Sequence, residues 1–191
     1  MGQLFSQLWR SWFPNREAKI VMVGLDNAGK TTILYRLHLG EAVKTVPTIG
    51  CNVEQVKVDS NLTFEIWDLA GQANLRPSWA AYYASTNAVI VVADCSDRAR
   101  LGILKQELFK QLQHEHLAGA CVLIYANKQD VAGAMSVQEL SEGLDLVGIK
   151  SHNWHVQASC ALTGEGLLDG LQWVAEELRR KDAAPAAPPH G

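Results

Sequence analysis

The sequence lacks any uninterrupted apolar run of the roughly 20 residues that a helix needs to cross a bilayer. Its first residues also lack the continuous apolar core and the small-residue cleavage site of a secretory signal peptide. These two absences argue against a membrane-spanning chain and against a secreted one.

Cysteine is scarce, and the four cysteines lie far apart, at positions 51, 95, 121 and 160. No two form a CxxC pair, and their spacing fits no zinc pattern. They fall in or beside apolar runs, where free thiols pack as small hydrophobic groups. We therefore expect a protein of a reducing compartment without a disulfide framework.

An excess of either charge is also missing, since the net charge is only -3. That balance does not favour nucleic acid as a partner. The chain has 191 residues, of which 48% are hydrophobic and 19% charged, as is typical of a single globular domain. We expect an N-terminal arm (residues 1–18), a globular body (19–181) and a disordered Ala- and Pro-rich tail (182–191).

Within the body, short apolar runs alternate with helical patterns. Buried strands are expected at 19–25, 88–94, 120–127 and 155–159, and helices at 31–40, 98–115, 136–147 and 165–181. Two more strands, 51–59 and 62–68, are separated by the hairpin signal Ser60-Asn61. This order predicts an α/β fold with a six-stranded, mostly parallel sheet covered by helices on both faces, and ligands at the carboxyl ends of the strands.

Residues 24–31 fit the phosphate-loop pattern GxxxxGK[ST], between an expected strand and an expected helix. Glycine lets the backbone curl so that its N–H groups face a phosphate. Lys30 would reach the terminal phosphates, and the Thr31 hydroxyl would bind Mg²⁺. ATPases and nucleotide kinases share this loop, so it predicts only a nucleoside triphosphate. The candidate contacts are Gly24, Asp26, Asn27, Ala28, Gly29, Lys30, Thr31 and Thr32.

The run NKQD, residues 127–130, ends a later apolar strand and predicts guanine recognition. The Asp130 carboxylate can accept hydrogen bonds from N1–H and the 2-amino group, which adenine lacks, and such a site discriminates by roughly 10⁴. Lys128 can lie across the purine, and Asn127 can tie its loop to the phosphate loop. In the loop after the last strand, a backbone N–H of Cys160 or Ala161 could meet the guanine O6.

Two further segments are candidates for switches that respond to the γ-phosphate. Thr48 in PTIG would supply a second hydroxyl to Mg²⁺, and Asp68 in DLAGQ would hold the ion through water. Gly71 could donate its N–H to the γ-phosphate, and Gln72 could orient the attacking water. Since no arginine lies between His38 and Thr48 to act in cis, we expect slow intrinsic hydrolysis that needs an activating protein.

The N-terminal arm combines a lipidation pattern with an amphipathic one. Met1-Gly2 followed by Ser6 matches N-myristoylation of Gly2. Apolar residues then recur at helical spacing up to Pro14, which would end the helix. One acyl chain anchors only marginally, so the apolar helix face would supply the second signal. That face could instead pack on the body, and the two positions could alternate with the nucleotide.

Together, GLDNAGKTTIL, PTIG, WDLAGQ, RPSW, NKQD, SCALTGEGL and the helix starting at Gly2 resemble the Arf and Arf-like branch of small GTPases. Ile149-Lys150, Trp154-His155 and residues 160–166 resemble its fifth-numbered Arf-like subgroup. The resemblance implies a GTP-hydrolysing switch with Mg²⁺, an exchange factor, an activating protein and effectors of the GTP form. It also implies trafficking work at Golgi or endosomal membranes. We expect a cytoplasmic protein that binds peripherally to membranes, those of the Golgi or trans-Golgi network. We expect a monomer.

The resemblance further implies an interswitch hairpin, residues 51–68, that slides to expel the N-terminal helix when GTP binds. Two residues depart from the family pattern. Ala70 replaces a usual glycine, which lowers the expected flexibility of the second switch, and Cys51 replaces an aromatic of the effector patch formed with Trp67 and Tyr82.

Two other classes stay open at this point. One is a nucleotide-binding adaptor with negligible hydrolysis, because Ala70 and the missing arginine leave the rate undetermined. The other is a P-loop kinase or ATPase, against which NKQD argues.

Overall fold

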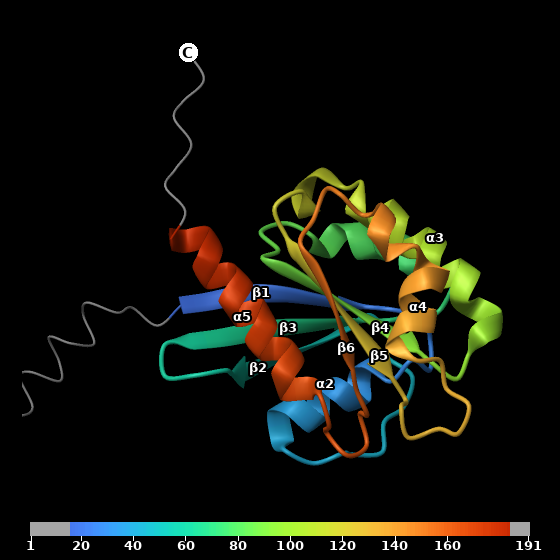
Figure 1. Cartoon of the computed structure of the whole chain (residues 1–191). Coiled ribbons are helices and arrows are strands. Elements are labelled where there is room, and N and C mark those ends of the chain that lie inside the picture. The colour runs from blue at the N-terminus through green and yellow to red at the C-terminus, as the bar shows by residue number, and fades with distance from the viewer. Residues whose placement is uncertain (1–15, 184–191) are drawn as a thin grey trace, which may run out of the picture.

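The computed structural model describes residues 16–183, which form a three-layer α/β domain (Figure 1). Its sheet has six strands in the order β2-β3-β1-β4-β5-β6, and only β2 is antiparallel to its neighbour. The strands are β1 (Arg16–Val23), β2 (Cys51–Lys57), β3 (Leu62–Leu69), β4 (Ala88–Asp94), β5 (Cys121–Asn127) and β6 (Trp154–Ala158). The predicted fold class is confirmed.

Helices cover both faces of the sheet. They are α2 (Lys30–Leu39), α3 (Leu101–Leu112), α4 (Val137–Leu144) and α5 (Leu167–Ala183). Four 3₁₀ segments lie in the connections: η1 (Arg76–Tyr82) between β3 and β4, η2 (Arg98–Arg100) before α3, η3 (Glu115–Leu117) after α3 and η4 (Leu146–Gly148) after α4. The core cluster on one face includes residues of α2 and α5, and the cluster on the other includes residues of α3 and α4. Among residues 16–183, no helix has both the length and the apolar character that crossing a bilayer requires.

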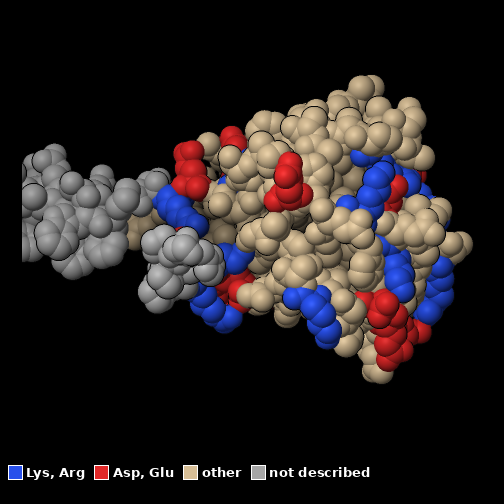
Figure 2. Space-filling view, turned by 90° about the horizontal axis from the view of Figure 1, so that it is seen from above, with Lys and Arg blue, Asp and Glu red and all other residues tan. Residues whose placement is uncertain are grey.

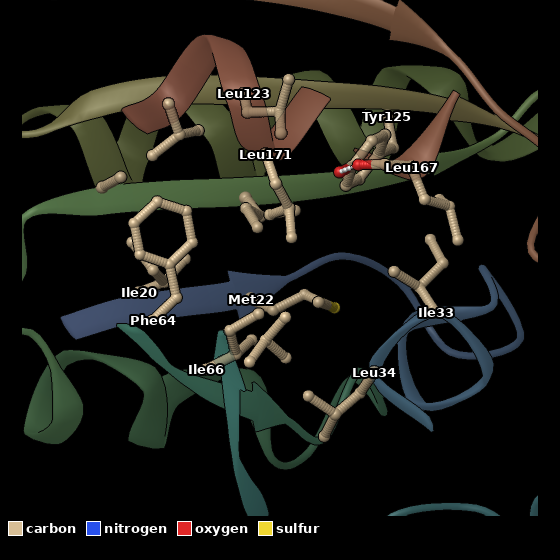
Figure 3. Packing of buried hydrophobic residues seen from close by; sticks show 14 of the residues in the cluster. Ile20, Met22, Ile33, Leu34, Phe64, Ile66, Leu123, Tyr125, Leu167 and Leu171 are labelled. Atoms are coloured by element: carbon tan, nitrogen blue, oxygen red, sulfur yellow. Dashed lines mark hydrogen bonds between the residues drawn. The ribbon is translucent and has the colours of Figure 1, made fainter. Parts of the chain in front are cut away.

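The face under α2 and α5 shows how alternate strand residues build the core (Figure 3). Ile66 lies beside Met22, whose side chain points toward Ile33 of α2, and all three are fully buried. Across the sheet the Tyr125 hydroxyl donates to the carbonyl oxygen of Leu167 at 2.6 Å. Because a phenol loses its water when buried, this bond both satisfies the hydroxyl and fixes the start of α5 against β5.

The chain ends differ from the expected boundaries. The first strand begins at Arg16, so three residues assigned to the arm belong to the sheet, and it ends at Val23 rather than at residue 25. Arg16 and Glu17 pair with Leu62 and Thr63 through the backbone, which explains why their charge does not exclude them from a strand. At the other end α5 continues through Ala183, two residues into the expected tail. The rest of the arm and of the tail lies outside the described residues.

The helix expected at 98–115 is three segments in the structure. The Asp97 side chain accepts from the Arg100 amide at 3.2 Å and starts a short 3₁₀ segment, and His114 likewise starts η3 after α3 has ended. The helix expected at 136–147 is shorter, because Ser136 is the N-cap of a capping box with Glu139 and Asp145 takes a left-handed C-cap conformation. The side chains of Asp97, His114 and Ser136 and the backbone N–H of Asp145 thus satisfy backbone groups that a continuous helix would otherwise satisfy.

Two helical glycines provide a matched test of the packing. A Cβ at Gly170 of α5 would lie 2.6 Å from Cε1 of the buried Tyr125, whereas a Cβ at Gly102 of α3 would meet nothing within 4 Å. We expect Gly170→Ala to lower the free energy of unfolding by about 1–3 kcal/mol through overpacking. We expect Gly102→Ala to raise it by about 0.5–1 kcal/mol through helix propensity. Guanidinium chloride unfolding of both variants checks this, and changes of the same sign would contradict it.

The face seen in Figure 2 carries acidic and basic side chains that are interspersed between large uncharged areas. This face therefore offers no continuous basic surface of the kind that binds a nucleic-acid backbone.

Candidate functional site

A cavity of about 460 Å³ lies at the carboxyl ends of β1 and β3. Its lining comes from the loop between β1 and α2, from residues 45–48 and from Gly71 and Gln72 after β3. Segments separated by up to 46 residues thus meet at the edge where ligands of α/β sheets bind. The phosphate loop and both predicted switches contribute to this one cavity.

The phosphate loop needs glycine at two positions for steric reasons. At Gly24 (φ 144°) a Cβ would lie 2.4 Å from the carbonyl oxygen of Val92 in β4. At Gly29 (φ 96°) it would lie 2.5 Å from the Asn127 side-chain amide. Gly29 is also the N-cap of α2 and makes no side-chain cap, so the first amides of that helix face the cavity. A loop of this form attracts an anion through its backbone N–H groups and the helix N-terminus.

Lys30 is the cation of this loop. Its Nζ donates to the carbonyl oxygens of Gly24 at 3.0 Å and Leu25 at 2.9 Å. Burial lowers the pKa of Lys30 to about 8, against the opposing effect of the nearby Asp68 and Asp26 carboxylates. A desolvated ammonium at the wall of the cavity is well placed to interact with phosphate oxygens, because its charge is little screened there.

The three predicted metal ligands lie together. The Thr31 and Thr48 hydroxyl oxygens are 2.8 Å apart, and Thr31 donates to Oδ2 of Asp68 at 2.6 Å. The other carboxylate oxygen, Oδ1 of Asp68, is buried and has no hydrogen-bond partner among the described residues. Burial raises the pKa of Asp68, although hydrogen bonds from Thr31 and Thr48 and the charge of Lys30 oppose this. Two hydroxyls and a carboxylate with an unpaired oxygen are a donor set that fits Mg²⁺.

After β3, Gly71 lies directly on the phosphate loop. A Cβ there would be 2.5 Å from each of three backbone atoms, Asp26 N, Gly24 O and Leu25 C, so only glycine fits. The buried Trp79 holds the preceding residue by donating from Nε1 to the Ala70 carbonyl at 2.9 Å. Trp79 is therefore a packing residue of this segment. Trp67, by contrast, is only partly buried and packs against Tyr82 with ring centroids 5.9 Å apart.

Asn127 connects three loops around the predicted base site. Its Nδ2 donates to the Ala28 carbonyl at 2.8 Å, and its Oδ1 accepts from the Ala161 amide at 3.0 Å. The expected tie to the phosphate loop is thus present. The Cys160 amide donates to the Glu165 carbonyl at 3.1 Å, so it holds the loop. A contact of the Ala161 amide with guanine O6 would share its hydrogen with Asn127, and it stays a prediction, as does the role of the exposed Asp130.

Sequence reasoning missed one residue of the base site. Asp94, at the end of β4, pairs through Oδ2 with Lys128 Nζ at 2.7 Å. Burial alone would raise the pKa of Asp94, but hydrogen bonds from Lys128 and Ser96 outweigh it and hold the pKa below its usual range. Lys128 itself has a left-handed backbone (φ 68°). The pair therefore holds the lysine that is predicted to lie across the purine in position. In the sequence, the only signal for Asp94 was a carboxylate at the end of a strand.

Two arginines were also missed, and both contact the phosphate loop. Arg100 reaches Asp26 through NH1, 3.0 Å from Oδ1, and through NH2, 3.2 Å from the carbonyl oxygen. Arg76 donates from Nε to the Gly71 carbonyl at 2.9 Å.

The four cysteines are all free, and only Cys51 is not fully buried.

Comparison with known proteins relates this chain to small GTPases of one family. The model of the ADP-ribosylation factor family matches residues 1–178. ADP-ribosylation factor-like protein 5A of Mus musculus is 54% identical over 179 residues, which are 94% of this chain and 99% of that protein. ADP-ribosylation factor 1 of Brassica rapa is 51% identical over 94% of this chain and 98% of its own. The solved Arl6 BBS3 small GTPase of Trypanosoma brucei, with the bound nucleotide analogue GppNp, is 36% identical with a TM-score of 0.80 and covers 86% of this chain and 99% of its own.

Proposed function

Because this chain belongs to the ADP-ribosylation factor family and is accordingly a GTP-binding, GTP-hydrolysing switch, we propose that its GTP form binds membranes and recruits effectors for vesicle trafficking. We further propose Golgi or trans-Golgi membranes as its peripheral site of action. An exchange factor would load it with GTP, and an activating protein would accelerate its slow hydrolysis.

The switch mechanism rests on one observation. The Thr31 and Thr48 hydroxyls and the Asp68 carboxylate are in hydrogen-bond contact beside Lys30. Thr48 lies in the segment 45–48 of the cavity wall, and its hydroxyl contacts Thr31 and Asp68, so a ligand bound here couples that segment to the phosphate loop. Mg²⁺ held by the two hydroxyls, and by Asp68 through water, would neutralise charge on the phosphates. Loss of the terminal phosphate would then release residues 45–48 and the segment after Gly71.

We assign the remaining phosphate and water roles by position around this cavity, and the base roles by the loops that Asn127 joins to the phosphate loop. Lys30 and the amides of residues 24–32 hold the phosphates, and the Gly71 N–H contacts the γ-phosphate. Gln72, which lines the cavity, orients the attacking water. Asn127, Lys128 and Asp130 hold the guanine with the loop at Cys160 and Ala161.

Coupling to the membrane would run through the start of β1. The predicted myristoylated Gly2 and the amphipathic helix lie outside the described residues, but the arm joins the body at Arg16. There the Arg16 amide donates to the Asn61 carbonyl at 2.9 Å, at the tip of the β2–β3 hairpin. A sliding hairpin would therefore disturb the arm at its point of attachment. This contact supports a nucleotide-dependent release of the arm.

Flotation of the N-myristoylated full chain on phosphatidylcholine–phosphatidylserine vesicles tests the proposal. We expect the GppNHp-loaded protein to float at least about tenfold more than the GDP-loaded protein, and Gly2→Ala to lose most of that binding. Single-turnover GTP hydrolysis on the same preparation checks the switch itself. Equal flotation in both nucleotide forms would overturn the membrane proposal while leaving the GTPase assignment intact.

A further inference from the structure

A buried guanidinium joins the second switch to the phosphate loop and to α3. The Arg76 side chain is only 9% exposed, and each of its three nitrogens faces a different segment. Nε donates to the Gly71 carbonyl at 2.9 Å, NH2 lies 3.6 Å from Oδ1 of Asp26, and NH1 lies 3.5 Å from Oε1 of Glu107. Since removing a cation from water is costly unless it is paired, these two carboxylates define where the side chain can rest.

The contact with Gly71 fixes a peptide plane at the cavity. The Gly71 carbonyl accepts from Arg76 Nε and also from the Asp26 amide at 3.2 Å. In a trans peptide the following N–H, here that of Gln72, points away from that carbonyl. Two donors on one carbonyl therefore set the direction in which Gln72 leaves the phosphate loop, and Gln72 lines the cavity.

Asp26 is itself held in place, so it gives Arg76 a fixed counter-charge. Arg100 contacts both the carboxylate and the carbonyl of Asp26, and its Nε lies 2.5 Å from Oδ2 of Asp97. The contacts of Arg100 reach the phosphate loop and the loop before α3 but not residues 71–72. Arg100 is thus a natural comparison for Arg76, since both share Asp26 and only one touches the second switch.

We propose that Arg76 is a positioning residue that holds Gly71 and Gln72 closed on the phosphate loop, so that it favours the triphosphate over the diphosphate and supports hydrolysis. This inference rests on the proposed roles of Gly71 and Gln72. Arg76 does not act as an arginine finger, because its two terminal nitrogens face Asp26 and Glu107 and its Nε is bound to Gly71. Its effect passes through the backbone of the second switch.

Lysine at this position keeps the charge but replaces the planar fork of three nitrogens with a single ammonium, so it separates geometry from charge. For Arg76→Lys we expect GppNHp to dissociate about tenfold faster, GDP dissociation to stay within twofold, and single-turnover hydrolysis to slow at least about tenfold. Fluorescent derivatives of both nucleotides give the dissociation rates. Arg100→Lys is expected to change the two dissociation rates in parallel, because it acts on the loop that both nucleotides share.

A purely structural role would change both nucleotides alike, so parallel changes for Arg76→Lys would overturn the inference. If the Arg76→Lys protein in its GDP form unfolds at a lower temperature than the wild type, Glu107→Gln, which removes one counter-charge, is the variant for that case. We expect Glu107→Gln to shift the ratio of the GppNHp and GDP dissociation rates by about threefold. An unchanged ratio in Glu107→Gln would equally overturn the inference. A wild-type chain that fails to hydrolyse GTP would instead contradict the proposed role of Gln72, and the ratio of dissociation rates would still decide the role of Arg76.

Discussion

Asp130→Asn is expected to reduce the preference of this protein for guanine over other purine nucleotides by roughly 10⁴. The carboxylate can accept two hydrogen bonds from N1–H and the 2-amino group, whereas an amide offers one acceptor and presents a donor to the other position. Xanthosine diphosphate has a carbonyl in place of the 2-amino group, so its affinity should rise as that of GDP falls. Calorimetry with GDP, xanthosine diphosphate and ADP in the presence of magnesium measures all three affinities.

The surroundings of Asp130 make this a test of specificity and not of folding. Asp130 is exposed, while the bonds that shape the site come from its neighbours: Asn127 ties three loops, and the Gln129 amide donates to the Ser159 carbonyl at 3.2 Å. Asp169→Asn, at an exposed carboxylate in the first turn of α5, is a matched control that should leave all three affinities unchanged. An Asp130→Asn protein that still prefers GDP would refute guanine recognition by this residue.

The parts of the fold that the sequence predicted are those with a local cause. An unbroken apolar run predicts β4 to the residue, and GxxxxGK[ST] predicts the phosphate loop because its glycines are needed for the curl itself. What was missed depends on contacts between distant residues. The pairs Arg100–Asp26 and Lys128–Asp94 are 74 and 34 residues apart, and neither partner has a local pattern that names the other.

The same distinction explains the errors at the boundaries. Arg16 and Glu17 are charged, yet they extend β1 because β3 offers them backbone partners. Asp97 and His114 divide one expected helix because their side chains accept from nearby amides, and such caps compete with helix continuation. Tertiary pairing and local capping thus override a periodicity that is otherwise correct.

Gly71→Ala is expected to slow single-turnover GTP hydrolysis by about 100-fold and to weaken GppNHp binding while GDP binding stays close to wild type. An added Cβ would lie 2.5 Å from three backbone atoms of residues 24–26, so no rotation of a side chain can relieve the clash and the whole segment must move. A displacement of about 1 Å at a catalytic group can lower a rate by about 100-fold. The proposed contacts of GDP with Lys30 and the phosphate loop would not involve this segment. Gly102→Ala is the control, since that position is open.

Combining Gly71→Ala with Arg76→Lys tests whether the two residues act through the same peptide. Arg76 holds the carbonyl of Gly71, and the alanine displaces that carbonyl, so the second change should add little to the first. We therefore expect the double variant to hydrolyse GTP within about threefold of Gly71→Ala alone. Effects that multiply, to about 1000-fold in total, would mean that Arg76 acts on hydrolysis by a route other than Gly71, because independent sites add in free energy.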